Sequence, residues 1–117
     1  RLFYLEQSVE DTLSTDLILT IERYIYDNYT DNISTDSLSL VFSLSRTYLC
    51  RLFKEITEFT VNEYLNYVRI EKAKYLLKTT KKLIVDIAFV VGYQSVSQFN
   101  RQFKKLTGVT PTKFRRT

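Results

Sequence analysis

The feature that most restricts the fold of this chain is an internal repeat with a spacing of about 50 residues. Residues 49–54 align with residues 99–104 at a shift of 50, and residues 38–44 align with residues 87–93 at a shift of 49. The one-residue difference falls near Gln94, in a connecting turn. Because a repeat determines architecture before any local assignment is made, the sequence predicts two structural units of the same design.

Each copy of the repeat indicates a short helix, a tight turn and a longer helix. In the first copy the short helix covers 36–42, the turn covers 43–44, and Ser45 can cap a longer helix that ends at about residue 55. In the second copy, Gly92 suits the turn and Ser95 can cap the longer helix. The repeated pattern is therefore a helix-turn-helix.

Each longer helix is predicted to have one apolar and one basic or polar face. The residues expected in the core are Leu49, Leu52, Phe53 and Ile56 in the first copy, and Phe99, Phe103 and Leu106 in the second. A buried face fixes the orientation of a helix, while Arg and polar side chains opposite to it can reach base edges and phosphates. This pattern is suited to a helix that enters the major groove of DNA.

Between the copies, residues 60–77 are predicted to form one uninterrupted helix. Eighteen residues at about 1.5 Å each give roughly 27 Å, a length that could hold two groove-binding helices about one DNA turn, or roughly 34 Å, apart. We predict a further helix over about 15–28 and a short final helix from Pro111 to Arg115, preceded by Gly108 as a left-handed cap.

The predicted organisation has four parts. Residues 1–14 are expected to be a linker or the tail of a missing N-terminal domain, because the chain starts at Arg1 without a Met and resembles a fragment. Residues 15–59 would form the first helix-turn-helix subdomain, residues 60–78 the connecting helix, and residues 79–117 the second subdomain.

Composition agrees with a helical globular protein. Hydrophobic residues make up 44% of the chain, and only two Gly and one Pro are present. The longest uninterrupted apolar run, residues 87–91, is far shorter than the roughly 20 residues that cross a bilayer. No membrane association is expected, and a cytoplasmic location fits best.

The residue types also argue against an enzyme. Cys50 is the only cysteine and there is no histidine, so the chain can form no internal disulfide, no ordinary metal cluster and no Ser/His or Cys/His pair. Too little glycine is present for a phosphate-binding loop. Acid-base chemistry by paired carboxylates stays open, but the acidic residues concentrate in the N-terminal part and imply no cleft. We expect no catalysis and no cofactor.

Charge is distributed unevenly along the chain. Up to residue 44 the net charge is −6, and from residue 45 onward it is +10. Such a basic segment is suited to a polyanion, although a solvated lysine-rich surface would have the same composition. A helical protein-interaction module without specific DNA binding is the alternative function. It would explain the aromatic core but not two repeated basic helices, and it predicts no steep salt dependence of DNA binding.

Over about residues 18–116 the chain resembles the DNA-binding domain of AraC/XylS-type regulators. The residues that carry the resemblance are 45–54, Arg69 with Ala73, Leu76 and Leu77, Ile84 with Ile87 and Ala88, 91–93, 99–101 with Phe103 and Lys104, and 107–116. The resemblance implies an all-α, homeodomain-like fold of about seven helices, with two helix-turn-helix subdomains joined by a long linker helix. It also implies a bacterial transcription regulator, usually an activator, with double-stranded DNA and RNA polymerase as partners. A separate ligand-sensing or dimerisation domain is implied outside these residues.

The resemblance also assigns DNA contacts. Base contacts are expected from Arg46, Thr47, Cys50, Arg51, Val96, Ser97, Asn100 and Arg101. Phosphate contacts are expected from Lys54, Lys81, Ser95, Lys104, Lys105 and Lys113. Arg51 and Arg101 are the strongest candidates, since each could donate to guanine O6 and N7; a phosphate contact or a surface ion pair is the alternative. Asn100 could pair with adenine, and any of the lysines could simply be solvated.

The chain departs from the family pattern at several positions. Ser43 stands where Gly is common, which would strain the first turn if it requires a positive φ. Leu40, Val41, Phe89 and Val90 are apolar where polar residues are usual, which favours tighter core packing or, less simply, a docking surface. Cys50 would place a thiol on a DNA-facing helix, which leaves redox control open as a minor alternative.

Overall fold

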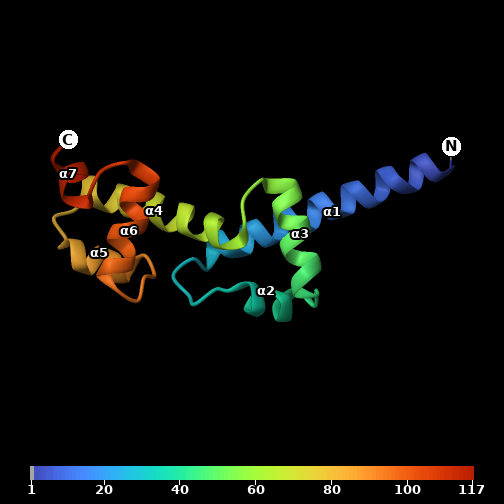
Figure 1. The fold of residues 1–117 in the computed structure, drawn as a ribbon, viewed down its shortest axis with the longest axis horizontal. Helices are drawn as coiled ribbons and strands as arrows, with labels where there is room; N and C mark the ends of the chain where they lie inside the picture. The colour runs from blue at the N-terminus through green and yellow to red at the C-terminus, as the bar shows by residue number, and fades with distance from the viewer. Residues whose placement is uncertain (1) are drawn as a thin grey trace. The chain divides into compact units, whose positions relative to one another are not determined.

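In a computed structural model, seven α-helices account for most of the described chain, which is residues 2–117, with side chains described from residue 11 onward (Figure 1). The helices are α1 (Leu2–Asp27), α2 (Thr35–Phe42), α3 (Arg46–Thr57), α4 (Val61–Thr79), α5 (Ile84–Val90), α6 (Val96–Thr107) and α7 (Pro111–Arg116). Residues 2–117 contain no β-strand. The predicted all-α fold is confirmed.

The helices group into two compact units. The first unit comprises residues up to 27 and residues 33–62, and the second comprises residues 28–32 and 63–117. The division falls near the start of α4, so nearly all of that helix belongs to the second unit. Each unit contains one copy of the repeat.

In the first unit, α1 and α2 pack against α3. Ile18, Ile21 and Ile25 recur at helical spacing along α1 and are fully buried, as are Leu38 of α2 and Leu49 and Phe53 of α3. The rings of Tyr24 and Phe42 meet edge to face with centroids 5.5 Å apart. This apolar core leaves the opposite face of α3 exposed.

The helix α1 is longer than predicted. A helix was expected over about 15–28, but the structure continues this helix back to Leu2. Residues 2–14 contain no Gly or Pro that would interrupt a helix, and they include good helix formers such as Leu, Glu and Gln. The start of α1 was therefore predicted too far along the chain.

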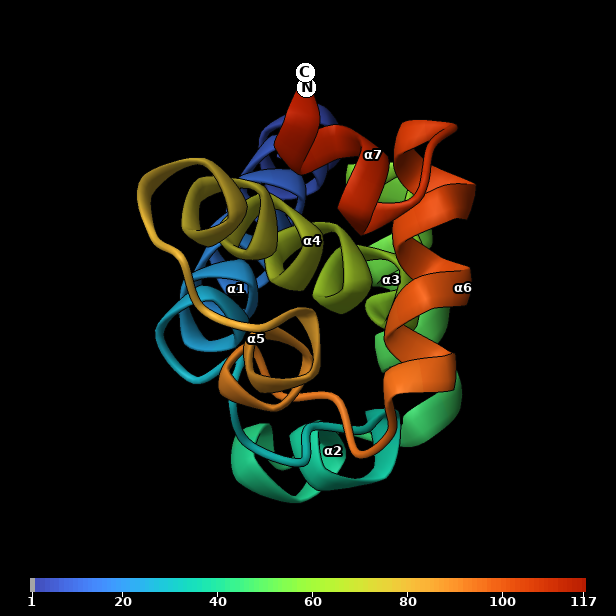
Figure 2. The ribbon, with the colours of Figure 1, turned by 90° about the vertical axis from the view of Figure 1, so that its left-hand side faces the viewer.

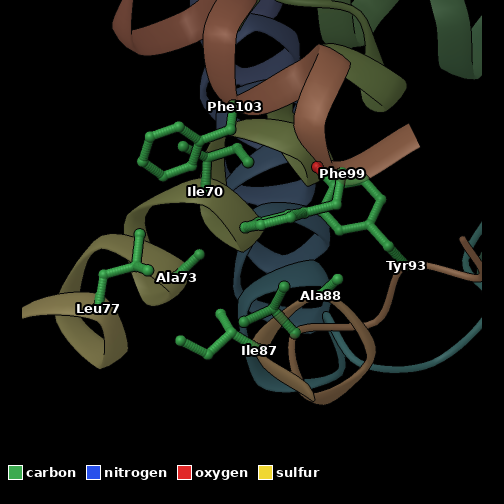
Figure 3. Packing of buried hydrophobic residues seen from close by; sticks show 9 residues of the cluster. Ile70, Ala73, Leu77, Ile87, Ala88, Tyr93, Phe99 and Phe103 are labelled. Carbon is green, nitrogen blue, oxygen red and sulfur yellow. The ribbon is translucent and has the colours of Figure 1, made fainter. Parts of the chain in front are cut away.

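In the second unit, α4, α5 and α6 enclose a continuous core. Figure 2 faces this unit and shows α5 and α6 on different sides of α4. The buried cluster consists of Ile70, Ala73, Leu77, Ile87, Ala88, Val91, Tyr93, Phe99 and Phe103 (Figure 3). Ring contacts continue from Tyr93 to Phe99, Phe103 and Phe114, with centroid separations of 5.5 to 5.7 Å. The burial predicted for Phe99 and Phe103 is confirmed.

Two core predictions are wrong at the same position of the repeat. Ile56 is 36% exposed and Leu106 is 46% exposed, although both were expected to be buried. In α3 no residue beyond Phe53 is buried, and in α6 none beyond Phe103. The last turn of each helix therefore extends past its core, even though its apolar residue keeps the helical spacing.

The turn between α5 and α6 packs tightly against α4. Gly92 has φ +109°, and a Cβ there would lie 2.9 Å from both Arg69 Nε and the Tyr29 carbonyl oxygen. Arg69 uses this space, because its Nε donates to the Tyr29 carbonyl and its Nη2 to the Asp31 carbonyl, both at 2.8 Å. Glycine is required here for both its backbone conformation and its small size.

Next to this turn, the Tyr93 hydroxyl donates to Asn66 Oδ1 at 2.6 Å, and the Arg69 guanidinium lies over the Tyr93 ring at 5.3 Å. Burial raises the pKa of Tyr93 to about 12, and the charge of Arg69 partly opposes that rise. Burial likewise lowers the pKa of Arg69, against the influence of Tyr93. The second helix-turn-helix is thus attached to α4 by a buried polar cluster.

Candidate nucleic-acid interface

The two helix-turn-helix turns have matching backbone hydrogen bonds. The amide of Leu44 donates to the Ser39 carbonyl at 3.0 Å, and the amide of Tyr93 donates to the Ala88 carbonyl at 3.0 Å. Both pairs are related by the shift of 49 found in the sequence. The first turn places Ser43 at φ +55°, so the expected strain at this non-glycine position is present.

Both longer helices begin with the predicted serine caps. Ser45 Oγ accepts a hydrogen bond from the Tyr48 amide, and Ser95 Oγ accepts one from the Gln98 amide, each at 3.1 Å. Each bond satisfies an amide that the first turn of a helix leaves without a partner. The caps set where α3 and α6 begin, and therefore which residues lie opposite the buried face.

The C-terminal ends of α3 and α6 also match. The Thr57 hydroxyl lies 2.7 Å from the Phe53 carbonyl and accepts from the Phe59 amide at 3.1 Å. The Thr107 hydroxyl lies 2.7 Å from the Phe103 carbonyl and accepts from the Val109 amide at 3.3 Å. The repeat therefore extends to individual hydrogen bonds, and the two outward faces can be compared position by position.

On α3, all of the predicted base-contacting residues are exposed. Arg46, Thr47, Cys50 and Arg51 lie on the face opposite Leu49, Leu52 and Phe53. Arg46 Nη1 lies 3.5 Å from Asp36 Oδ1, and Arg51 Nη1 lies 3.5 Å from Glu55 Oε1. Arg51 also lies 5.6 Å from the centroid of the Tyr48 ring. Both arginines of α3 therefore lie within ion-pair distance of a carboxylate of their own unit.

Part of α7 lies beside the outward face of α6. Ser97, Asn100 and Arg101 are exposed, whereas Val96 is half-buried because it packs against the core of the second unit. Its methyl groups are correspondingly less available to DNA than those of an exposed residue.

A hollow of about 810 Å³ lies along this face of α6. It is lined by Ile84, Ser97, Asn100, Arg101, Lys104, Lys105, Thr110, Pro111 and Thr112. Three predicted base-contacting residues and two predicted phosphate-contacting lysines therefore share one concave surface. Thr110 shapes it by capping α7 with a bond from the Lys113 amide at 3.2 Å, as the sequence predicted.

The remaining predicted phosphate contacts are exposed and come from several elements. Lys81 lies between α4 and α5, Lys113 lies on α7, and Ser95 is occupied as a helix cap. Lys54 donates to the Glu58 carbonyl at 2.7 Å. Of the predicted phosphate contacts, Lys104 and Lys105 line the hollow on α6, and Lys81 and Lys113 are not among its lining residues.

Sequence reasoning missed the acidic partners of the α3 arginines and the structural role of Arg115. The spacing of four between Arg51 and Glu55 is the signal that could have identified that ion pair. Arg115 Nε donates to the Leu77 carbonyl at 3.1 Å, which fastens α7 to the end of α4. This arginine is therefore a structural residue, although it lies in a basic segment.

Other kinds of site receive no support from residues 11–117. This part of the chain contains no group of three His, Cys, Asp or Glu side chains placed to hold a metal ion. Across the described residues, no helix combines the length and apolar character needed to cross a membrane. Cys50 is a free, exposed cysteine.

Comparison with known proteins decides the family. A family model described as a helix-turn-helix domain matches residues 38–117. The C-terminal domain of AraT, a response regulator from Geobacillus stearothermophilus, is 31% identical with a TM-score of 0.82, covering 85% of this chain and 83% of that chain. An AraC-type transcriptional regulator from Chromobacterium violaceum is 25% identical with a TM-score of 0.75, covering 92% and 94%. The chain belongs to the AraC/XylS family.

Relatives of this AraC/XylS chain include the Msm operon regulatory protein of Streptococcus mutans, which is 30% identical over 98% of this chain and 41% of the relative. Three curated relatives are matched over 41% to 55% of their own lengths. The AraC-type domain described here thus corresponds to only part of those longer regulators.

Proposed function

We propose that this chain binds double-stranded DNA sequence-specifically, as the DNA-binding part of a bacterial transcription activator. The observation that carries the proposal is the pair of equivalent helices, α3 and α6. Each is capped by a serine, fixed by buried leucine or phenylalanine side chains, and exposed along a polar or basic face. Two such faces are suited to two adjacent major-groove segments.

The exposed residues have the chemistry that base contacts require. Arg51 and Arg101 can each donate two hydrogen bonds to guanine O6 and N7, and Asn100 can bond to adenine N6 and N7. Thr47 and Val96 can offer methyl groups to thymine, and Arg46, Cys50 and Ser97 lie beside them on the same faces. Lys54, Lys81, Ser95, Lys104, Lys105 and Lys113 complete the proposal as phosphate contacts.

The wider regulatory role is proposed on family grounds. Curated relatives are about twice as long as the matched segment, so we propose that ligand sensing or dimerisation belongs to a separate domain. RNA polymerase is the proposed protein partner, and the cytoplasm, where bacterial DNA lies, the proposed location. Regulation of transcription rather than catalysis is the activity that these residues support.

Selection of tight-binding duplexes from random DNA tests the proposal. We expect enrichment of a defined sequence, and we expect Arg51→Ala or Arg101→Ala to relax the preference at one segment by a factor of about 5 to 150. Lys104→Ala, in contrast, should weaken binding to all sequences alike. It should also lower the slope of log K against log salt by about 0.9.

A protein that enriches no sequence would contradict the proposal and favour a helical protein-interaction module instead. If Lys104→Ala altered the sequence preference while Arg101→Ala did not, the assignment of base and phosphate contacts on α6 would be reversed.

A further inference from the structure

The two DNA-facing surfaces differ in charge although the repeat makes them equivalent. Glu55 in α3 corresponds to Lys105 in α6, and Asp36, beside α3, corresponds to Val85. The difference in charge comes from these two differences in residue type, since the caps, turns and terminal hydrogen bonds of the two units match.

In the first unit, both carboxylates lie where they oppose a polyanion. Asp36 and Glu55 each contact an α3 arginine at 3.5 Å, and their side chains are 75% and 58% exposed. Exposed pairs of this kind contribute little to stability. They do, however, keep negative charge next to the arginines that would meet DNA.

In the second unit, the α6 cations have no such partners. Within residues 11–117, none of Arg101, Lys104 and Lys105 forms an ion pair with a carboxylate. All three line the hollow on α6. This surface can therefore accept phosphates without first separating an ion pair.

A carboxylate beside a phosphate has different consequences on different DNA sequences. In water, one negative charge about 8 Å from a phosphate weakens binding about twofold. An arginine that leaves its carboxylate partner to pair with a single phosphate gains little binding free energy to offset this repulsion. An arginine that forms two directed hydrogen bonds with guanine gains a contact available only on the correct sequence.

We propose that the two units divide their work on duplex DNA. The second unit, through Lys104 and Lys105, supplies affinity for DNA of any sequence. In the first unit, Asp36 and Glu55 weaken binding to incorrect sequences, so that α3 contributes mainly discrimination. Glu55 is a specificity-determining residue, which acts by holding Arg51 and repelling phosphates. This inference rests on the proposed function.

The test measures dissociation constants of the full chain for a selected duplex and for a scrambled duplex of equal composition. Glu55→Gln should tighten binding to the scrambled duplex about two- to threefold and change the selected duplex less, so the ratio of the two constants narrows. Glu55 lies near the C-terminus of α3, where losing a negative charge does not weaken the helix. Asp36→Asn should act in the same direction.

Asp27→Asn is the matched control. Asp27 forms an exposed ion pair with Arg23 at 3.2 Å, also four residues apart, but on α1. The substitution Asp27→Asn changes the net charge by the same amount as Glu55→Gln. It should leave the ratio of the two dissociation constants unchanged. Lys105→Gln, at the position equivalent to Glu55, should weaken both duplexes alike and lower the salt slope by about 0.9.

Three outcomes would overturn the division of work: Glu55→Gln tightening both duplexes equally, Asp27→Asn narrowing the ratio as much as Glu55→Gln, or Lys105→Gln narrowing the ratio as well. In each of these the wild type still prefers the selected duplex, so the proposed function stands. If the wild type itself shows no preference between duplexes, the proposed function fails and the division of work fails with it.

Discussion

At the scale of single residues, the two copies of the repeat use different residue types at the positions that have a positive φ. The second copy uses Gly92 and Gly108 at positive φ, whereas the first uses Ser43 at φ +55° and Glu58 at φ +69°. A side chain in this left-handed region costs about 1 kcal/mol or more. The first unit therefore carries backbone strain that the second avoids.

We expect Ser43→Gly to raise the free energy of unfolding of the first unit by about 0.5 to 1 kcal/mol, because relief of strain exceeds the extra flexibility of the unfolded chain. Gly92→Ala should lower the stability of the second unit by about 2 to 4 kcal/mol, because its Cβ would collide with Arg69 and the Tyr29 carbonyl. Urea unfolding followed by circular dichroism measures both changes.

Gly108→Ala is the control for the second substitution. Gly108 also has a positive φ, but no atom lies within 4 Å of its would-be Cβ. It should therefore cost only the backbone term. If Gly92→Ala were no more destabilising than Gly108→Ala, the close packing against Arg69 would have no energetic importance.

At the scale of elements, α4 holds the second helix-turn-helix through the hydroxyl of Tyr93. The unfolded chain loses a tyrosine proton near pH 10, whereas the buried Tyr93 keeps its proton to about pH 12. The unfolded state therefore binds fewer protons between these values. As a result, the free energy of unfolding falls as pH rises through this range, by about 1 kcal/mol at pH 11.

Tyr93→Phe should separate the contribution of the hydrogen bond to stability from the contribution of the Tyr93 titration. At pH 8 the variant should be less stable by about 1 kcal/mol, because the buried hydrogen bond to Asn66 Oδ1 is lost. By pH 11 the difference should shrink towards zero, since only the wild type loses stability by this route. Urea unfolding at both pH values measures it, with Tyr75→Phe at an exposed ring as the control. A difference that stays constant would contradict the account.

Most elements could be predicted because their signals are local. Ser45, Ser95 and Thr110 act as caps where the sequence placed them, and Phe99 and Phe103 are buried at helical spacing. The misplaced residues, Ile56 and Leu106, keep the correct spacing but lie past the end of the neighbouring core. The spacing of residues indicates on which side of a helix a side chain lies. Burial also requires a neighbouring element at the same level along the helix axis.

At the scale of the whole molecule, the candidate site was only partly predictable. The repeat and the charge distribution located the exposed faces of α3 and α6, because each exposed face lies opposite a buried face. The ion pairs of Arg46 and Arg51 depend on how flexible side chains settle on a surface, and on a carboxylate from another helix for Arg46. The hollow on α6 depends on the approach of α7, which sequence spacing does not describe.

Footprinting on a selected duplex tests the central claim, that one chain uses two equivalent helices on DNA. We predict protection of two adjacent major-groove segments on one face, with centres about 10 base pairs apart. Arg51→Ala should weaken protection at one segment and Arg101→Ala at the other. Protection confined to a single segment, reduced by only one of the two substitutions, would contradict the account.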